Sequence, residues 1–197
     1  GECIAGHACC MGGLNYTNAA GEQYNIETLK YLMSDITLHT SDGHEIELKE
    51  VHFVDINDPS TLSFDSGELD NGSYIGISFT MGLDTSLNID NRYVNESWDG
   101  VMEWPMNLGY HYMKLEGAFD TITNGYRTHT GPTMGMDMSF NKSYDISLNV
   151  DDNLGDVHIY MKMELNNWYK NPNEISFASY GPAGNNGIMQ NMMMQHK

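Results

Sequence analysis

The chain has 197 residues, 40% of them apolar, and it carries 27 Asp and Glu against only nine Lys and Arg. A formal charge of −18 repels nucleic-acid phosphates and anionic lipid, so we expect neither as a partner. No run of about 18 apolar residues is present, so we expect no membrane-spanning helix.

The N-terminal segment differs from the rest because it holds all three cysteines, Cys3, Cys9 and Cys10. We therefore divide the chain into a Cys-rich segment, residues 1–15, and one domain, residues 16–197. The cysteine spacing matches neither a zinc-ribbon pair nor a haem-attachment motif. Two interpretations stay open: a disulfide with a spare thiol, which suits an oxidising compartment, or a thiolate metal cluster that includes His7.

Alternating apolar and polar residues, which are typical of strands, run along most of the chain. They predict a strand over residues 31–39, opened by about one turn of helix. Asp42-Gly43 is a turn signal, and a second strand is expected over residues 46–56 with a bulge near Glu50.

The later part of the chain predicts more short strands around a long polar loop. Asn71-Gly72 indicates a hairpin between Leu62 with Phe64 and a strand from Tyr74 to Met81. Residues 82–101 form a loop long enough to be functional or disordered. Further strands are expected at about 107–117, 125–130, 144–150 and 156–166. This pattern predicts an all-β fold, an antiparallel β-sandwich with long loops and an irregular Met-rich C-terminal tail.

Enzyme motifs are missing from the sequence. There is no GxSxG, no HExxH, no P-loop and no GxGxxG that opens a helix. Because these motifs are missing, we do not expect an enzyme. His39 and His44 flank the Asp42-Gly43 turn, and we expect both to be solvated.

Methionine is abundant, with 15 residues in the chain, and it clusters at 134–138, 161–163 and 192–194, the last followed by His196. Thioether and imidazole groups are ligands that suit copper. Methionine also fills cores, and for Met161 and Met163 we favour that interpretation. For residues 189–196 both interpretations stay open.

Two strand histidines, His52 and His129, are candidates for a metal site together with Trp104. His52 lies among apolar neighbours, and His129 precedes a Gly-Pro break. A lone strand histidine is more typical of a satisfied core residue than of a ligand.

Residues 84–91 offer oxygen ligands that suit calcium, but they lack the EF-hand order, so a solvated loop is the better interpretation.

Five stretches in order resemble the MbnP-like family: residues 16–38, 51–55, 72–79, 104–117 and 129–131. The resemblance covers roughly residues 16–196. It implies an exported bacterial β-sandwich protein of the periplasm, cell surface or extracellular space. It also implies copper binding without catalysis and a partner dihaem protein of the peroxidase type.

The resemblance carries over to particular residues. Relatives bind copper with histidines and a tryptophan oxidised to kynurenine. His52 and His129 thereby become candidate metal ligands, and Trp104 the candidate for the modified or site-lining indole. Met106 and His111 depart from the family pattern, but their place in the chain lets us expect both beside Trp104 where the long loop meets the sheet. The Trp-x-His pairing of the oxidised site is absent, because Trp98, Trp104 and Trp168 are followed two places on by Gly100, Met106 and Lys170.

A second hypothesis is a structural or adhesive surface module. The same sandwich would present its Asn- and Gly-rich loops to a partner, a glycan or copies of itself. Persistent oligomers after chelation would favour this hypothesis over copper binding.

Overall fold

A computed structural model of the protein describes residues 13–104, 108–132, 136–170 and 173–180. Strands dominate, and every strand pair is antiparallel, which confirms the predicted all-β antiparallel fold class. The strands are β1 (Tyr16–Thr17), β2 (Gln23–Tyr24), β3 (Thr28–Thr40), β4 (Glu45–Asp55), β5 (Gly72–Met81), β6 (Met113–Phe119), β7 (Thr121–Thr130) and β8 (Phe140–Val150). The short helices are η1 (Pro59–Thr61), α1 (Asp99–Met102), η2 (Leu165–Tyr169) and α2 (Phe177–Tyr180).

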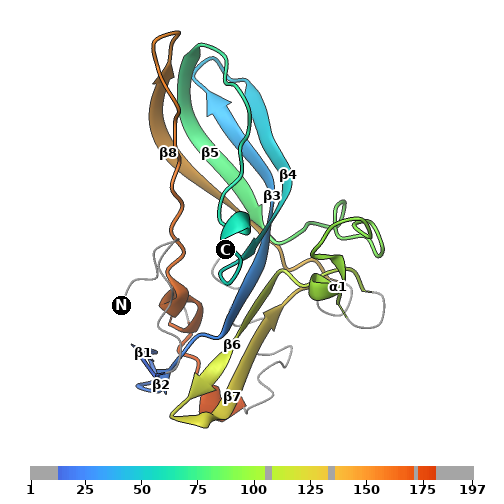
Figure 1. Cartoon of the computed structure of the whole chain (residues 1–197), viewed down its shortest axis with the longest axis vertical. Coiled ribbons are helices and arrows are strands. Elements are labelled where there is room, and N and C mark those ends of the chain that lie inside the picture. Colours follow the sequence, from blue (N-terminus) through green and yellow to red (C-terminus); the bar gives the residue numbers. More distant parts are fainter. Residues whose placement is uncertain (1–12, 105–107, 133–135, 171–172, 181–197) are drawn as a thin grey trace.

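The long strand β3 joins two groups of strands. β4 pairs with β3 along most of its length, β6 pairs with its first residues, and β5 pairs with the remainder. We call β4, β3, β5 and β8 the upper leaf, and the start of β3 with β6 and β7 the lower leaf. Figure 1 shows the two leaves at opposite ends of the molecule, with β3 running between them.

The beginning of β3 and its bulge test two predictions. Thr28 to Tyr31 are already extended and paired with β6, so the predicted opening turn of helix is wrong. A sheet partner satisfies backbone groups that a single helical turn would leave unpaired. The register between β3 and β4 shifts between Lys49 and Glu47, close to the predicted bulge at Glu50.

Three predicted strands need correction. Residues 62–71 form no strand and no hairpin with β5, but bring Phe64 and Leu69 against the core of the upper leaf. The expected strand over 107–117 begins only at Met113, and Leu108, which a core strand would bury, is 47% exposed. Residues 156–164 have no strand pairing in the described structure, although their sequence alternates.

The buried residues form three clusters. One lies on the lower leaf under η2 and α2, one lies beneath the loop at 82–101, and one lies on the upper leaf. Met163 packs against the first cluster, as predicted, whereas Met161 is 41% exposed and is not a core residue.

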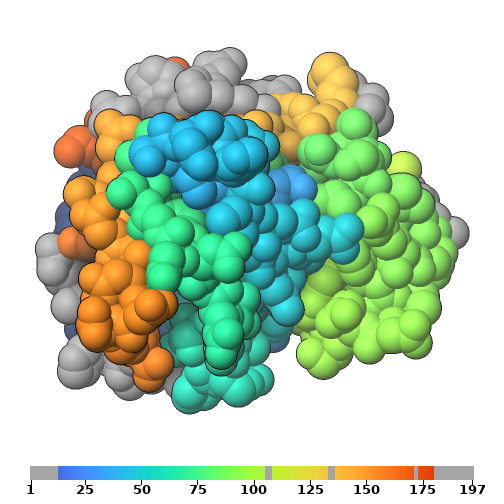
Figure 2. Space-filling model, turned by 90° about the horizontal axis from the view of Figure 1, so that it is seen from above, coloured from blue at the N-terminus to red at the C-terminus, as the bar shows by residue number. Residues whose placement is uncertain are grey.

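The polar loop at residues 82–101 is a packed part of the domain. Figure 2, seen from above, shows this green segment as a compact block beside the cyan strand β4. An ion pair of 3.0 Å between Arg92 and Glu50 links the two. The loop buries four large side chains: Leu83, Leu87, Tyr93 and Trp98.

A buried carboxylate anchors the C-terminal helices to the lower leaf. Glu22 accepts hydrogen bonds from Asn18 Nδ2 at 2.6 Å and Ser176 Oγ at 2.7 Å. It also accepts from the backbone N–H groups of Phe177 and Ala178, at 2.8 and 2.9 Å. Burial opposes ionisation, but together these hydrogen bonds outweigh it and lower the pKa of Glu22 below its ordinary value of 4.5.

We expect Glu22→Gln to reduce the free energy of unfolding by about 2–4 kcal/mol near neutral pH, because an amide cannot accept all four hydrogen bonds. A lowered folded-state pKa stabilises the fold above the unfolded pKa of about 4.5, and this stabilisation is lost as pH falls through the folded value. The difference from wild type should therefore shrink from about pH 7 to about pH 4. Urea unfolding at both pH values measures it, and an unchanged difference would contradict the role of the carboxylate.

Candidate metal centre

Three aromatic side chains meet where α1, β6 and β7 converge. The ring centroids of Trp104 and His111 are 4.4 Å apart. Those of His111 and His129 are 5.0 Å apart, with the rings nearly perpendicular. We call Trp104, His111 and His129 the ring cluster.

Backbone pairing brings Trp104 and His111 together from the two sides of residues 105–107. Glu103 and Tyr110 form an antiparallel bridge, and Trp104 N–H donates to Gly109 C=O at 2.7 Å. His111 N–H donates to Met102 C=O at 2.6 Å. These contacts place two residues seven positions apart side by side.

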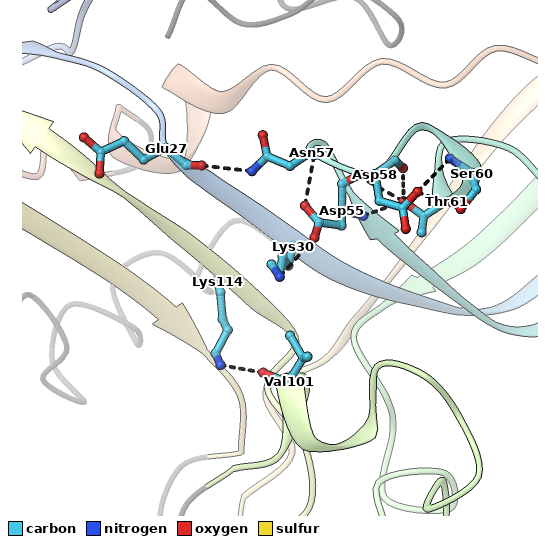
Figure 3. Close-up of polar contacts among 9 residues, drawn as sticks. All are labelled: Glu27, Lys30, Asp55, Asn57, Asp58, Ser60, Thr61, Val101 and Lys114. Atoms are coloured by element: carbon cyan, nitrogen blue, oxygen red, sulfur yellow. Dashed lines mark hydrogen bonds and ion pairs between the residues drawn. The ribbon is translucent and has the colours of Figure 1, made fainter. Parts of the chain in front are cut away.

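A lysine on β6 holds helix α1 against that strand. Figure 3 shows Lys114 Nζ donating to the Val101 carbonyl in α1, at 2.6 Å. Lys114 lies opposite Lys30 on β3, and Lys30 forms a 3.0 Å ion pair with Asp55 at the end of β4. The chain of contacts fixes α1, and with it Trp104, relative to three strands.

Trp104 lies against the backbone just after β7. A Cβ built at Gly131 would be 2.5 Å from Trp104 Cε3 and 2.6 Å from Cζ3. Only glycine leaves room for the indole at this distance. The Gly-Pro break that follows His129 in the sequence therefore has a steric role: it admits Trp104 beside the histidines.

His111 is buried, with 5% of its surface exposed, and it is neutral at physiological pH. Burial is the main cause that lowers its pKa to about 3, and it outweighs the hydrogen bond to Met102. The Nδ1 atom lies 3.1 Å from the Met102 carbonyl. A carbonyl can only accept, so Nδ1 carries the hydrogen and Nε2 carries the lone pair.

In His129 the other ring nitrogen carries the hydrogen. Its Nε2 atom lies 2.5 Å from Glu116 Oε1, so Nε2–H donates to the carboxylate and the lone pair is on Nδ1. Burial lowers the pKa of His129, and Glu116 opposes that shift. A carboxylate or carbonyl on the far nitrogen is the usual outer contact of a metal-binding histidine, because it fixes the tautomer and raises ligand basicity.

The ring cluster offers two neutral imidazole nitrogens to one ion. Metal–nitrogen bonds are about 2 Å long, so an ion bound to both rings would hold the two nitrogens at most about 4 Å apart. Ring centroids at 5.0 Å are compatible with that separation. Within the described ranges, no three His, Cys, Asp or Glu side chains gather in a way that could hold a metal ion. Two imidazoles are thus the donors these residues supply.

The structure does not bring His52 to the ring cluster. His52 pairs with Met33, whereas His129 pairs with Lys114, which pairs with Lys30. The two histidines are therefore three rows and three strand positions apart, about 14 Å across the sheet alone, and they project from opposite faces. His52 instead packs on Phe64, with ring centroids 4.8 Å apart. One ion cannot contact both His52 and His129, so the structure does not join the two candidates in one site, and each stays a candidate ligand by itself.

The loop proposed for calcium uses its oxygen atoms internally. Asp84 Oδ1 accepts from the N–H groups of Ser86 and Leu87, at 2.8 and 3.0 Å, and from Ser86 Oγ at 2.6 Å. Asn88 Oδ1 accepts from Tyr110 N–H at 2.8 Å. These contacts favour the structural interpretation of the loop, and calcium binding stays a prediction.

Several predicted candidates lie outside the described residues. They are the cysteines with His7, Met106, and the terminal methionines with His196. Sequence reasoning placed His111 in the pocket only as a lining residue and missed it as the partner of His129. The absent Trp-x-His pairing was the signal, because a histidine beside Trp104 then had to come from elsewhere in the sequence. In the structure this histidine is His111.

Comparison with known proteins adds one finding. Neither a curated protein nor a solved structure matches the chain. None of the helices in the described ranges has the length and apolar character needed to cross a membrane. The family model described as MbnP matches residues 6–193, nearly the whole sequence. The chain therefore belongs to the MbnP family.

Proposed function

We propose that this protein binds copper between His111 and His129, beside Trp104, and that the copper centre is not catalytic. The observation that carries the proposal is the pair of neutral imidazoles, each with its far nitrogen fixed by an acceptor, at a centroid distance of 5.0 Å. Imidazole nitrogen is a good copper ligand, and copper lies at the top of the divalent affinity series.

Burial supports retention of the ion in this centre. His111 is almost fully buried, and the side chain of His129 is 17% exposed. Neither imidazole needs to lose a proton at neutral pH, because burial lowers both pKa values. The two imidazoles can therefore accept a cation without the usual competition from protons.

The cell compartment and the partner belong to the same proposal. The family resemblance supports export to the periplasm, cell surface or extracellular space, and a dihaem partner of the peroxidase type. The acidic surface, with its charge of −18, suits a protein that attracts cations.

The test is a metal inventory of natively isolated protein by elemental mass spectrometry, alongside its intact mass. We expect about one copper per chain, because the ring cluster supplies one pair of donors. A mass change that maps to Trp104 and matches kynurenine would extend the proposal to a modified indole. Metal-free protein that takes up neither Cu(I) nor Cu(II) at stoichiometric level would overturn it.

A self-assembling surface module remains the second candidate function. It is favoured by the extended segment at residues 156–164, where apolar side chains lie exposed without strand pairing in the described structure. These side chains include Val157, Ile159, Met161 and Tyr160, the last 89% exposed. Sedimentation with and without a chelator separates the candidates: chelator-resistant oligomers support assembly, and a monomer in both conditions argues against it.

A further inference from the structure

A serine, a histidine and a glutamate are aligned across three neighbouring strands of the upper leaf. His39 Nε2 on β3 lies 2.7 Å from Ser78 Oγ on β5. His39 Nδ1 lies 3.5 Å from Glu45 Oε1 on β4. His39 was expected to be solvated, but only 32% of its side chain is exposed. The three groups stand in the order nucleophile, base and carboxylate.

The tautomer of His39 follows from its neighbours. A carboxylate accepts hydrogen bonds, so the Glu45 side favours hydrogen on Nδ1. The lone pair is then on Nε2, where it can accept the hydrogen of the Ser78 hydroxyl. This is the arrangement in which an imidazole activates a serine as a general base.

The serine opens onto a hollow of about 180 Å³. Ser143 on β8 also lines it and lies directly opposite Ser78 in the sheet register, so their Cβ atoms are about 5 Å apart. Asn141 lines the hollow as well, and its Oδ1 accepts from Thr80 Oγ1 at 2.8 Å. The Asn141 amide nitrogen and the Ser143 hydroxyl are thus donors close to the nucleophile.

We propose that Ser78 and His39 form a second, hydrolytic site for small esters, with Glu45 as a positioning residue. Ser78 Oγ attacks the ester carbonyl carbon while His39 Nε2 takes the hydroxyl proton. The ester C–O bond breaks, and His39 returns the proton to the departing alkoxide, which leaves as the alcohol. Water then attacks the acyl-serine with His39 as base, which releases the carboxylic acid and restores Ser78.

The developing oxyanion has two candidate partners, Asn141 and Ser143. The hollow beside Ser78 is small, so a short acyl group such as acetyl is the suitable test substrate. Glu45 is 73% exposed, so water screens its interaction with the imidazole. Turnover is therefore slow, and trapping of the serine is a sharper readout than rate alone.

This site is independent of the ring cluster. His39 lies nine positions along β3 from Lys30, the residue in register with Lys114 and His129, a distance of about 30 Å along the strand. Loss of copper and loss of ester hydrolysis can therefore be observed separately in one preparation.

The experiment uses the full chain, purified with a chelator, and p-nitrophenyl acetate with a fluorophosphonate probe. We expect the probe to label Ser78, as located by peptide mass spectrometry. We expect Ser78→Ala and His39→Ala to lower ester hydrolysis by about 100-fold or to background. Glu45→Gln should lower kcat several-fold and leave KM unchanged, because a residue that only orients the base contributes no substrate contact.

Two matched variants control for surface chemistry. Ser73 also lies on β5 and donates to a cross-strand side chain, Asn149 at 2.6 Å, and it forms no hydrogen bond to a histidine within the described ranges. His44 is an exposed imidazole on the neighbouring turn. Ser73→Ala and His44→Ala should keep both rate and labelling. A Ser78→Ala variant that folds, as judged by circular dichroism, and hydrolyses the ester at the wild-type rate would overturn the proposal, as would labelling spread over several serines.

Discussion

His129→Ala and His111→Ala are each expected to weaken copper binding by about 100-fold or more, whereas His52→Ala leaves it unchanged. Loss of an outer contact of a metal ligand costs about 10- to 100-fold, and loss of the ligand itself costs more. His111 and His129 supply the two imidazoles of the ring cluster. His52 packs on Phe64 on the other face of the sheet.

The measurement is a competition titration of Cu(I) against a coloured chelator, with the three variants and wild type in parallel. His52→Ala is the matched control because it also removes a half-buried strand histidine. The free energy of unfolding of each metal-free variant separates lost ligands from lost structure. A protein that loses copper with His52→Ala but keeps it with His129→Ala would place the site elsewhere.

Gly117→Ala is expected to destabilise the protein by about 3–5 kcal/mol, among the largest effects of any single methyl group in this chain. A Cβ at Gly117 would lie 2.3 Å from the Asn25 carbonyl oxygen and 2.9 Å from Tyr126 Cε1. Those atoms cannot move freely. Asn25 bonds Ala118 through its N–H and its Oδ1, and its carbonyl accepts the Tyr126 hydroxyl at 2.8 Å.

Urea unfolding of Gly117→Ala beside Gly125→Ala measures this effect. Gly125 lies on β7 opposite Ala118, and a Cβ there would meet the nearest atom, the Gly117 carbonyl, at an ordinary 3.8 Å. The control variant should therefore stay within about 1 kcal/mol of wild type. Equal losses in the two variants would show that strand propensity, and not the close approach of Asn25, governs stability at this position.

The sequence predicted strands correctly where a segment of alternating apolar and polar residues also has a partner strand. Residues 31–39 alternate, and most of them pair with β4 and several with β5 as well, so the period of two was sufficient to place this part of β3. Residues 156–164 alternate equally well, yet have no strand pairing in the described structure. Alternation reports which side chains could share a face, but the presence of a partner strand depends on tertiary structure.

The site was predicted in part for a related reason. Trp104 and His129 were identified from motif resemblance, and they do lie in one cluster with His111. The sequence could not tell that His52 and His129 lie apart, because their faces depend on the register across four strands, which no local pattern encodes. His111 reaches Trp104 through a backbone bridge between Glu103 and Tyr110, and that contact is equally invisible in the sequence.

The shared strand β3 also sets the order in which the protein can fold. Its hairpin with β4 closes through a short turn, so it can form early and at low entropic cost. Its pairing with β6 joins Leu29 to Leu115, so the lower leaf waits until more than half of the chain is available. The ring cluster requires β6 and β7 and is therefore completed late, which keeps His111 and His129 apart until the strands that orient them have paired.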